Sequence, residues 1–336
     1  MNVTFFYRSN AAGFSIAKVF RSLVDGMGAQ IGCKEFFVPA RRADPYSIIR
    51  NLLFVYKKRN RNGINHITGD IHYCVLALIG CKTVLTVHDL SMMDRISNPL
   101  KKLLIKWFWF SIPVFFADRV VCISKTTYNE LLKIVPGRKV SFIHNAVDPS
   151  FQFTPKVFND HCPSILQIGT SWNKNLVNVI SALKGIKCLF TIVGQLNPEL
   201  EKKLIDSSIS YKVLQNLSDE EILYEYVACD VVCFCSIYEG FGMPIIEANA
   251  VGRCIVTSAL EPMLEVAGGS ACIVDPYSVE SIREGLLKVI SEETYRTMLI
   301  SSGLENVKRF DVADAVNKYF NIYAAIGSAG WEEPKN

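Results

Sequence analysis

Residues 238–247 bring together the residue types best suited to binding chemistry. They read Tyr-Glu-Gly-Phe-Gly-Met-Pro-Ile-Ile-Glu, in which Gly240, Phe241 and Gly242 follow a predicted strand and precede a predicted helix. Pro244 suits the first turn of that helix. Because the N–H groups at a helix start are unpaired and lie at the positive end of the helix dipole, this turn is expected to bind an anion.

Two carboxylates flank the glycine turn. Glu247 lies one helical turn beyond Pro244, where a carboxylate can accept two hydrogen bonds from a vicinal diol. Glu239 stands at the end of the strand, where it can bind a second polyol. The pattern therefore favours a site for a sugar, a phosphate and a second sugar. The alternative is a glycine turn with a solvated glutamate on each side, which needs no ligand.

A second polar cluster occurs earlier, in the sequence His-Ile-Thr-Gly-Asp-Ile-His that begins at His66. The strand predicted at Ile64–Ile67 ends before Gly69, so Asp70 and His72 fall at its carboxyl end. There either side chain can bind a hydroxyl group of an acceptor molecule. The alternative is an aspartate that caps the next helix and a histidine packed in the core.

The run from Lys101 to Phe116 contains three lysines, two tryptophans and four phenylalanines. This composition is typical of a helix at a membrane interface. The run also precedes a predicted strand, which fits a core helix that covers a sheet, and one face can pack while the other touches lipid. No nucleic-acid motif accompanies it. We therefore expect contact with an anionic membrane surface through Lys101–Phe116 and no nucleic-acid partner.

Alternating strands and helices must position these groups. In the first half, strands are expected at residues 3–6, 35–38, 64–67, 83–87, 119–123 and 140–143. A helix is expected at 15–24, and another at 46–58 with its apolar face on Ile48, Ile49, Leu52, Leu53 and Val55. Apolar strands that alternate with amphipathic helices indicate βαβ units around a parallel sheet.

The same alternation restarts in the second half. Strands are expected at 164–168, 189–193, 212–214, 231–234, 254–257 and 271–274, and helices at 176–183, 198–206, 219–227, 244–250, 279–290, 293–307 and 312–325. Residues 154–163, with two prolines, are the expected connection. We predict an α/β protein of two doubly wound, Rossmann-like domains, at 1–150 and 151–310, that face each other across a ligand-binding cleft. A helix at 311–326 is expected to pack back on the first domain.

Length, charge and cysteine content fit this organisation. The 336 residues suffice for two domains, and 50% are hydrophobic, which excludes a disordered chain. Residues 1–150 hold 21 Lys and Arg against 9 Asp and Glu, a net charge of +12, whereas residues 151–336 hold 15 against 23, a net charge of −8. The 11 cysteines are scattered without zinc-site spacing and are expected to be buried, reduced thiols. No signal peptide is indicated, so a cytoplasmic protein is expected.

The stretch that joins Glu239 to Glu247 resembles the signature of the retaining family 4 glycosyltransferases, which have the GT-B fold of two Rossmann-like domains. Further segments match that family in order along nearly the whole chain: Thr86-Val87-His88-Asp89, Ile123-Ser124-Lys125, Asn145-Ala146-Val147-Asp148, Ile168-Gly169-Thr170 with Lys174-Asn175, Val193-Gly194, Leu264-Glu265-Val266 and Asp275-Pro276. So many segments in order make the resemblance specific.

The resemblance implies a donor site in the second domain. Glu247 would hold the ribose hydroxyls of a nucleotide. Glu239, with the amides of residues 240–242, would hold the transferred sugar. Lys174, in the loop that Gly169 opens, would neutralise the diphosphate leaving group.

The resemblance also implies roles for the first domain, the acceptor side. His88 would sit near the reacting face of the donor sugar and act in catalysis with Glu239 and Lys174. Gly13, in the loop after the first strand, would let the backbone approach the phosphates. The chain departs from the family at two places, since Asn173 stands where an arginine is frequent and two alanines precede Gly13 where a second glycine is frequent.

The implied activity is retaining transfer of a hexose-type sugar from a nucleotide-diphosphate donor to a glycan or lipid-linked acceptor, in cell-surface polysaccharide synthesis at the inner face of a membrane. A lysine and a helix start can stabilise the leaving group without a metal, and the chain has no Asp-x-Asp motif, so neither metal nor cofactor is expected. Front-face attack, with a donor phosphate oxygen as base, is the expected course. The alternatives are a non-catalytic sugar-nucleotide-binding subunit, toward which Asn173 points, and a GT-B phosphorylase or epimerase.

Overall fold

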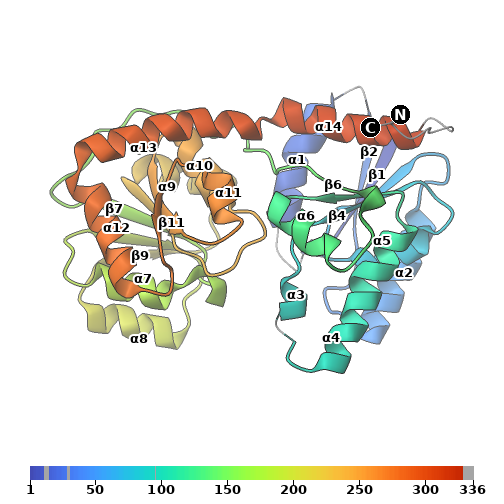
Figure 1. Cartoon of the computed structure of the whole chain (residues 1–336), viewed down its shortest axis with the longest axis horizontal. Helices are drawn as coiled ribbons and strands as arrows, with labels where there is room; N and C mark the ends of the chain where they lie inside the picture. Colours follow the sequence, from blue (N-terminus) through green and yellow to red (C-terminus); the bar gives the residue numbers. More distant parts are fainter. Residues whose placement is uncertain (11–14, 29–30, 95, 328–336) are drawn as a thin grey trace. The chain divides into compact units, whose positions relative to one another are not determined.

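The computed structural model describes residues 1–10, 15–28, 31–94 and 96–327. Within them the chain forms two compact units (Figure 1). Unit 1 is Met1–Ala146 together with the last helix, α14 (Val312–Gly327), and unit 2 is Val147–Asp311. The segment expected as a connection, 154–163, lies within unit 2, where the N–H of Thr154 donates to the carbonyl of Val251.

Unit 1 is built on a six-stranded, entirely parallel sheet with the order β2-β1-β3-β4-β5-β6. Its strands are β1 (Asn2–Tyr7), β2 (Gly32–Phe37), β3 (Ile64–Ile67), β4 (Thr83–Val87), β5 (Arg119–Cys122) and β6 (Val140–Phe142). Every residue of β3 and β4 is buried, as expected for parallel strands covered on both faces. The strands predicted for the first half are confirmed, with small shifts at their ends.

Helices cover both faces of this sheet because neighbouring strand residues point to opposite sides. Phe5 of β1 packs with α1 and α14, whereas Phe6 packs on the opposite face with residues of η3 and η4. The helical elements of unit 1 are α1 (Ser15–Met27), α2 (Pro45–Lys58), the 3-10 helix η3 (His72–Leu78), α3 (Ser91–Asp94), α4 (Pro99–Ile105), the π-helix η4 (Lys106–Ser111), α5 (Ile112–Phe116), α6 (Lys125–Leu132), the 3-10 helix η5 (Gly137–Lys139) and α14.

The predicted inner face of α2 is partly wrong. Ile49 and Leu53 are 56% and 55% exposed, whereas Asn51 is fully buried. The Asn51 side chain accepts from the N–H of Ala40 and donates to the carbonyl of Ala40 and to the hydroxyl of Tyr73. A buried amide whose hydrogen bonds are satisfied costs little, so the helix turns Asn51 inward in place of the two apolar residues.

Residues 99–116 form one helical segment in three parts, α4, η4 and α5. The π turn is marked by the N–H of Ile112, which donates to the carbonyl of Trp107, five residues back. Trp109 and Phe110 on this segment are buried in the core of unit 1, which confirms its packed face. Trp107 and Phe115 remain exposed. Among the described residues, no helix has the length and apolar character that a bilayer crossing requires.

Unit 2 repeats the architecture with a second parallel sheet of six strands in the order β12-β11-β10-β7-β8-β9. The predicted strands and helices of the second half are confirmed with small end shifts. The strands are β7 (Ser164–Ile168), β8 (Leu189–Val193), β9 (Ser210–Leu214), β10 (Val231–Phe234), β11 (Cys254–Ser258) and β12 (Cys272–Val274). The helices are η6 (Trp172–Lys174), α7 (Leu176–Leu183), α8 (Pro198–Ser207), α9 (Asp219–Ala228), α10 (Met243–Val251), α11 (Met263–Ala267), α12 (Val279–Ser291), α13 (Glu293–Asn306) and η7 (Val307–Phe310). All 11 cysteines of the chain are free thiols, and most are buried.

The helix α14 completes the core of unit 1 although it follows unit 2 in sequence. It lies beside α1 (Figure 1), and Tyr319 and Tyr323 are buried between it and the sheet. His66 of β3 is fully buried there, with Nδ1 2.6 Å from the hydroxyl of Tyr323 and Nε2 2.8 Å from Oγ1 of Thr86. Burial lowers the pKa of His66 to about 3, so the imidazole is neutral and its two ring nitrogens form these contacts in the uncharged state.

Unit 1 should therefore lose stability when the pH falls below the ordinary pKa of histidine. Below about pH 6.5, His66 is protonated in the unfolded chain, whereas in the folded chain it stays neutral until about pH 3. Between these values, each unit of falling pH lowers the free energy of unfolding by about 1.4 kcal/mol. Urea unfolding at pH 7.5 and 5.5 measures this loss. His66→Gln should be less stable at both pH values but less sensitive to pH, and an unchanged pH dependence in this variant would contradict the assignment.

Candidate functional site

The sheet of unit 2 reverses its strand order between β7 and β10. From β7 the chain adds β8 and β9 on one side, and β10 begins a run of β11 and β12 on the other. At such a reversal the loops that follow the two strands leave in opposite directions and open a crevice at the carboxyl ends, where ligands of doubly wound sheets bind. Residues 169–175 follow β7 and residues 235–242 follow β10.

Lys174 and Glu239 join these two loops. Lys174 Nζ lies 2.7 Å from Glu239 Oε1, and each side chain is 16% exposed. The ammonium group also lies 4.7 Å from the centroid of the Phe234 ring. Asn173 Nδ2 donates to the same carboxylate oxygen at 3.1 Å and to the Tyr238 carbonyl at 2.9 Å. Asn173 is thus a neutral hydrogen-bond donor of this cluster.

Backbone geometry after β7 places Lys174. Gly169 has a φ of +86°, and a Cβ there would lie 2.9 Å from Lys174 Cε, so glycine lets the lysine stem lie against the backbone. Asn175 has a φ of +60° and precedes α7. Its amide donates to the carbonyls of Cys235 at 3.0 Å and Pro276 at 2.7 Å, which ties the loop after β7 to the end of β10.

Glu247 lies on α10, which begins after Gly242 at a φ of +120° and has Pro244 in its first turn as predicted. The hydroxyl of Tyr226, on α9, donates to Glu247 Oε2 at 2.6 Å. Tyr226 is fully buried, and burial together with the Glu247 charge raises its pKa well above the ordinary value, so it remains a donor. Sequence reasoning missed Tyr226, because an aromatic residue on an amphipathic helix gives no signal of the carboxylate it orients.

The sheet of unit 1 has the corresponding reversal between β1 and β3. Arg8, just after β1, forms an ion pair with Asp70, just after β3. Both line a pocket of about 550 Å³, which His72, Asp89 and Lys101 also line. The structure therefore brings the predicted acceptor residues Asp70 and His72 into one pocket, and Arg8 is a charged partner that sequence reasoning did not identify.

Two histidines lie near this pocket. His72, on η3, is buried with Nδ1 3.2 Å from the carbonyl of Trp109, and burial lowers its pKa to about 4. Its buried Nε2 has no hydrogen-bond partner in the described part of the chain. His88 Nε2 lies 2.7 Å from the Thr68 carbonyl, and burial is the largest cause that lowers its pKa. A neutral His88 therefore donates through Nε2 and keeps Nδ1 as an acceptor.

The predicted site residues fall into two groups, each within one unit. Unit 2 holds Gly169, Lys174, Glu239, Gly240, Phe241, Gly242 and Glu247, and unit 1 holds Asp70, His72 and His88. Gly13 lies outside the described residues. Across the described ranges, no group of three or more His, Cys, Asp and Glu side chains is arranged to hold a metal ion.

Two family models match the chain, one over each half. The model described as Glycosyltransferase Family 4 matches residues 9–151, which include Asp70, His72 and His88. The model described as Glycosyl transferases group 1 matches residues 153–305, which include Lys174 and both glutamates. Together the two models span nearly the whole chain.

Relatives and solved structures agree with these matches. O-antigen chain mannosyltransferase B of Escherichia coli is 30% identical over 115 residues, which are 34% of this chain and 30% of that protein. O-antigen chain mannosyltransferase RfbU of Salmonella typhimurium is 25% identical over 217 residues, 61% of this chain and 60% of that protein. The match thus spans less than two thirds of either relative. The structure of Anabaena Alr3699/HepE in complex with UDP and glucose is 14% identical with a TM-score of 0.76, over 96% of this chain and 99% of that one, and shows the same GT-B fold.

The packing of His88 against Gly69 can be tested by substitution. Gly69 has a φ of +138°, and a Cβ there would lie 2.3 Å from His88 Cδ2. Gly69→Ala should therefore cost about 2–4 kcal/mol of unfolding free energy, from backbone strain plus overpacking. Gly80→Ala is the matched control, because Gly80 also has a positive φ but no atom within 4 Å of its Cβ position, and should cost about 1–2 kcal/mol.

A double variant isolates the contact. If the clash is with the imidazole, Gly69→Ala should cost at least about 1 kcal/mol less in a His88→Ala background, as urea unfolding would show. Equal costs in the two backgrounds would mean that His88 does not restrict residue 69.

Proposed function

Because the chain belongs to the family 4 glycosyltransferases, we propose that it moves a hexose-type sugar from a nucleotide-diphosphate donor to a glycan or lipid-linked acceptor. We place this transfer in cell-surface polysaccharide synthesis. The names of the two O-antigen mannosyltransferases support that role, and the UDP and glucose bound to the Anabaena protein support the donor class.

The observation that carries the proposal is the ion pair of Lys174 and Glu239 at the strand reversal of unit 2. A cation, a carboxylate and the helix start at Gly242 gather there, which suits a diphosphate and a sugar. In this assignment Lys174 receives the diphosphate, and Glu239 with the amides of residues 240–242 receives the transferred sugar. Glu247, oriented by Tyr226, receives the ribose hydroxyls.

The catalytic contribution of Lys174 is electrostatic. Charge builds on the diphosphate as the glycosidic bond breaks, and a fixed cation stabilises that charge more in the transition state than in the bound donor. Asn173 adds a neutral donor beside it. The proposal is a metal-independent, retaining transfer by front-face attack, in which a donor phosphate oxygen takes the proton of the acceptor hydroxyl.

The acceptor is assigned to the pocket at the strand reversal of unit 1. Asp70, paired with Arg8, offers a carboxylate acceptor to sugar hydroxyls. The neutral His72 donates through Nδ1 to the Trp109 carbonyl, so its Nε2, which has no partner among the described residues, is a second acceptor. His88 is assigned to the reacting face of the donor sugar. The net charge of +12 on residues 1–150 and the exposed aromatics of the 99–116 segment support work at the cytoplasmic face of an anionic membrane.

Hydrolysis of nucleotide sugars in the absence of acceptor tests the activity. The wild type should release nucleoside diphosphate from uridine- or guanosine-diphosphate sugars, and excess chelator should leave the rate unchanged. Lys174→Ala should lower the turnover number about a hundredfold with a much smaller change in donor affinity, because leaving-group charge peaks in the transition state. Lys174→Arg should recover part of the rate, and Lys202→Ala, at an exposed lysine of α8, is the control.

Each outcome bears on a separate claim. Donor binding without hydrolysis or transfer would favour the non-catalytic subunit. Loss of activity with chelator, and rescue by a divalent ion, would overturn the metal-free mechanism. A Lys174→Ala effect confined to affinity would make the lysine an anchor of the ground state only.

Glu247→Gln should weaken nucleotide binding about thirtyfold, equivalent to about 2 kcal/mol, because a charged acceptor to two hydroxyls is lost. Tyr226→Phe should weaken it less, since the carboxylate remains but loses the hydroxyl that orients it. Calorimetric titration with uridine or guanosine diphosphate measures the effect. Inorganic diphosphate, which lacks ribose, is the control ligand, and an equal loss for both ligands would contradict the ribose role.

A further inference from the structure

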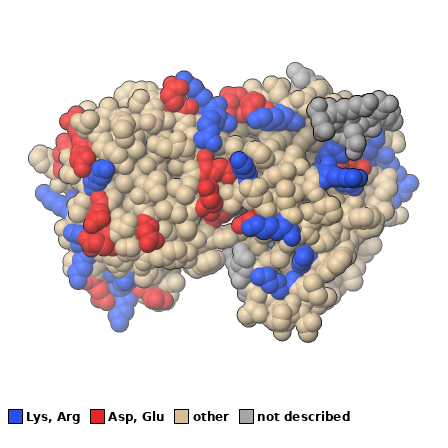
Figure 2. Space-filling model, viewed as in Figure 1, with Lys and Arg blue, Asp and Glu red and all other residues tan. Residues whose placement is uncertain are grey.

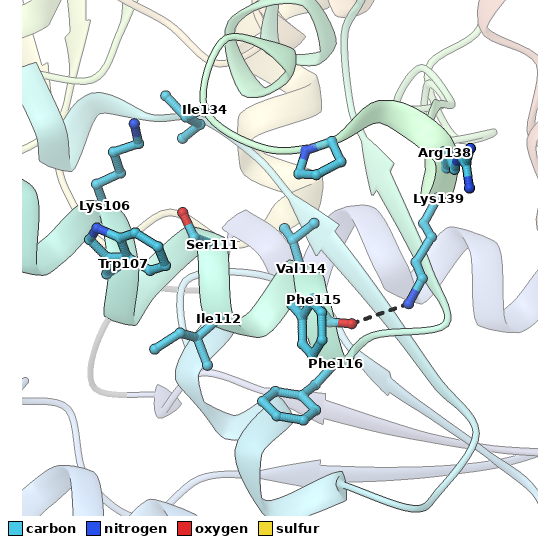
Figure 3. Close-up of a pocket in the computed structure, with 11 residues that line it drawn as sticks. Lys106, Trp107, Ser111, Ile112, Val114, Phe115, Phe116, Ile134, Arg138 and Lys139 are labelled. Atoms are coloured by element: carbon cyan, nitrogen blue, oxygen red, sulfur yellow. Dashed lines mark hydrogen bonds between the residues drawn. The ribbon is translucent and has the colours of Figure 1, made fainter.

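A large apolar groove lies in unit 1, away from the strand reversal. Its volume is about 630 Å³, which is in the range of small-molecule sites, roughly 300–1,000 Å³. We call it the α5 groove. Its apolar walls come from η4 and α5 on one side and from the residues just before η5 on the other (Figure 3): Trp107, Ile112, Val114, Phe115, Phe116 and Ile134.

The exposed aromatics of this groove are not needed for the core. The 99–116 segment already packs Trp109, Phe110 and Val114 into unit 1. Phe115 is nevertheless 72% exposed and Trp107 56% exposed. Leu100, Leu103 and Leu104 extend this exposed apolar surface along α4. An apolar patch of this kind on a surface indicates a binding partner.

The groove is held open by a fixed wall. Lys139 Nζ donates to the carbonyls of Phe115 at 3.1 Å and Ala117 at 3.0 Å, which ties η5 to the end of α5 (Figure 3). Phe115 and Phe116 pack edge to face with ring centroids 5.1 Å apart. The hydrogen bonds of Lys139 thus join the two sides of the groove at the end of α5.

The charged side chains among the described residues that line the groove are all basic, namely Lys106, Arg138 and Lys139. Figure 3 shows Lys106 beside Trp107 at one end and Arg138 with Lys139 at the other. On the face drawn in Figure 2, the surface over α4 and α5 is mostly uncharged, with basic side chains beside it. An apolar groove with cations at its ends complements a molecule in which a hydrocarbon chain is attached to an anionic group.

We propose that the α5 groove binds an acyl chain of an anionic membrane phospholipid, with the headgroup phosphate beside Arg138 or Lys106. This inference rests on the proposed function, because it names the lipid contact through which the transferase would reach a lipid-linked acceptor. The 99–116 segment links the two places: Lys101 and Ile105 line the acceptor pocket, and the next residues, Lys106 and Trp107, line the groove. A lipid in the groove sets the acceptor pocket beside the bilayer surface.

The test uses the full chain and phosphatidylglycerol–phosphatidylcholine vesicles at low salt. The wild type should bind them at least tenfold more tightly than vesicles of phosphatidylcholine alone. Lipids with brominated acyl chains should quench tryptophan fluorescence, and Trp107→Phe should remove most of that quenching. Phe115→Ser should weaken vesicle binding at least fivefold. Lys106→Gln and Arg138→Gln should each weaken it about fivefold.

Matched controls separate the groove from general effects. Tyr277→Ser removes an exposed aromatic residue of unit 2, and Lys202→Gln removes an exposed cation of unit 2; both should leave vesicle binding unchanged. All groove variants should keep the rate of donor hydrolysis in vesicle-free solution. A wild type that binds vesicles but never hydrolyses or transfers a sugar would refute the proposed function and leave the lipid site standing.

Three results would overturn the lipid site. The first is a wild type that does not bind anionic vesicles at low salt. The second is binding that responds to the charge variants but not to Phe115→Ser and shows no quenching by brominated chains, which is surface adsorption alone. The third is a dimer in vesicle-free solution that Phe115→Ser dissociates, which would assign the groove to a second copy of the chain.

Discussion

Each sheet depends on a single reversal in the order of its parallel strands. All strands of a sheet end at the same edge, and only at the reversal do neighbouring loops diverge far enough to admit polar side chains. An ion pair spans the reversal in both units, Arg8 with Asp70 and Lys174 with Glu239. Lys174 and Glu239 are each only 16% exposed, so either charge would be costly if it stood alone. Their pairing therefore stabilises the polar site of unit 2 when no ligand neutralises it, and a ligand must compete with the partner already present.

The carboxylate of Glu239 is held by one cation and one neutral donor. Asn173 donates to the Glu239 oxygen that also accepts from Lys174, so the carboxylate is held by one charged and one neutral donor. A cation in place of Asn173 would put a second positive charge beside that carboxylate. The present arrangement concentrates the positive charge on Lys174, whose stem lies against the backbone of Gly169.

The strands and most helices were predictable because buried parallel strands are apolar throughout and their helices are amphipathic. Glu239 was predicted as a site residue from its place at a strand end, and Lys174 only from the resemblance to the family; the contact between them was not predicted. The inner face of α2 was missed because Asn51 is buried through hydrogen bonds to Ala40 and Tyr73, which are set by tertiary structure. Tyr226 and Arg8 were missed for the same reason: their partners, Glu247 and Asp70, are distant in sequence. The π turn at Lys106–Ser111 has no sequence signal of comparable strength.

The position of α14 has a consequence for how the chain folds as it is synthesised. One of the two hydrogen-bond partners of His66, on the third strand, is Tyr323 of α14. A ribosome-bound chain that already contains all six strands of unit 1 therefore still lacks one side of that core. Unit 2 is contiguous in sequence and can fold as soon as it emerges. The first unit to be translated is then the second to be completed. Until α14 arrives, the face that it covers, which includes Phe5 and Phe20, is open to chaperones and proteases. A chain that ends before α14 would therefore have a destabilised unit 1, although unit 1 is encoded first.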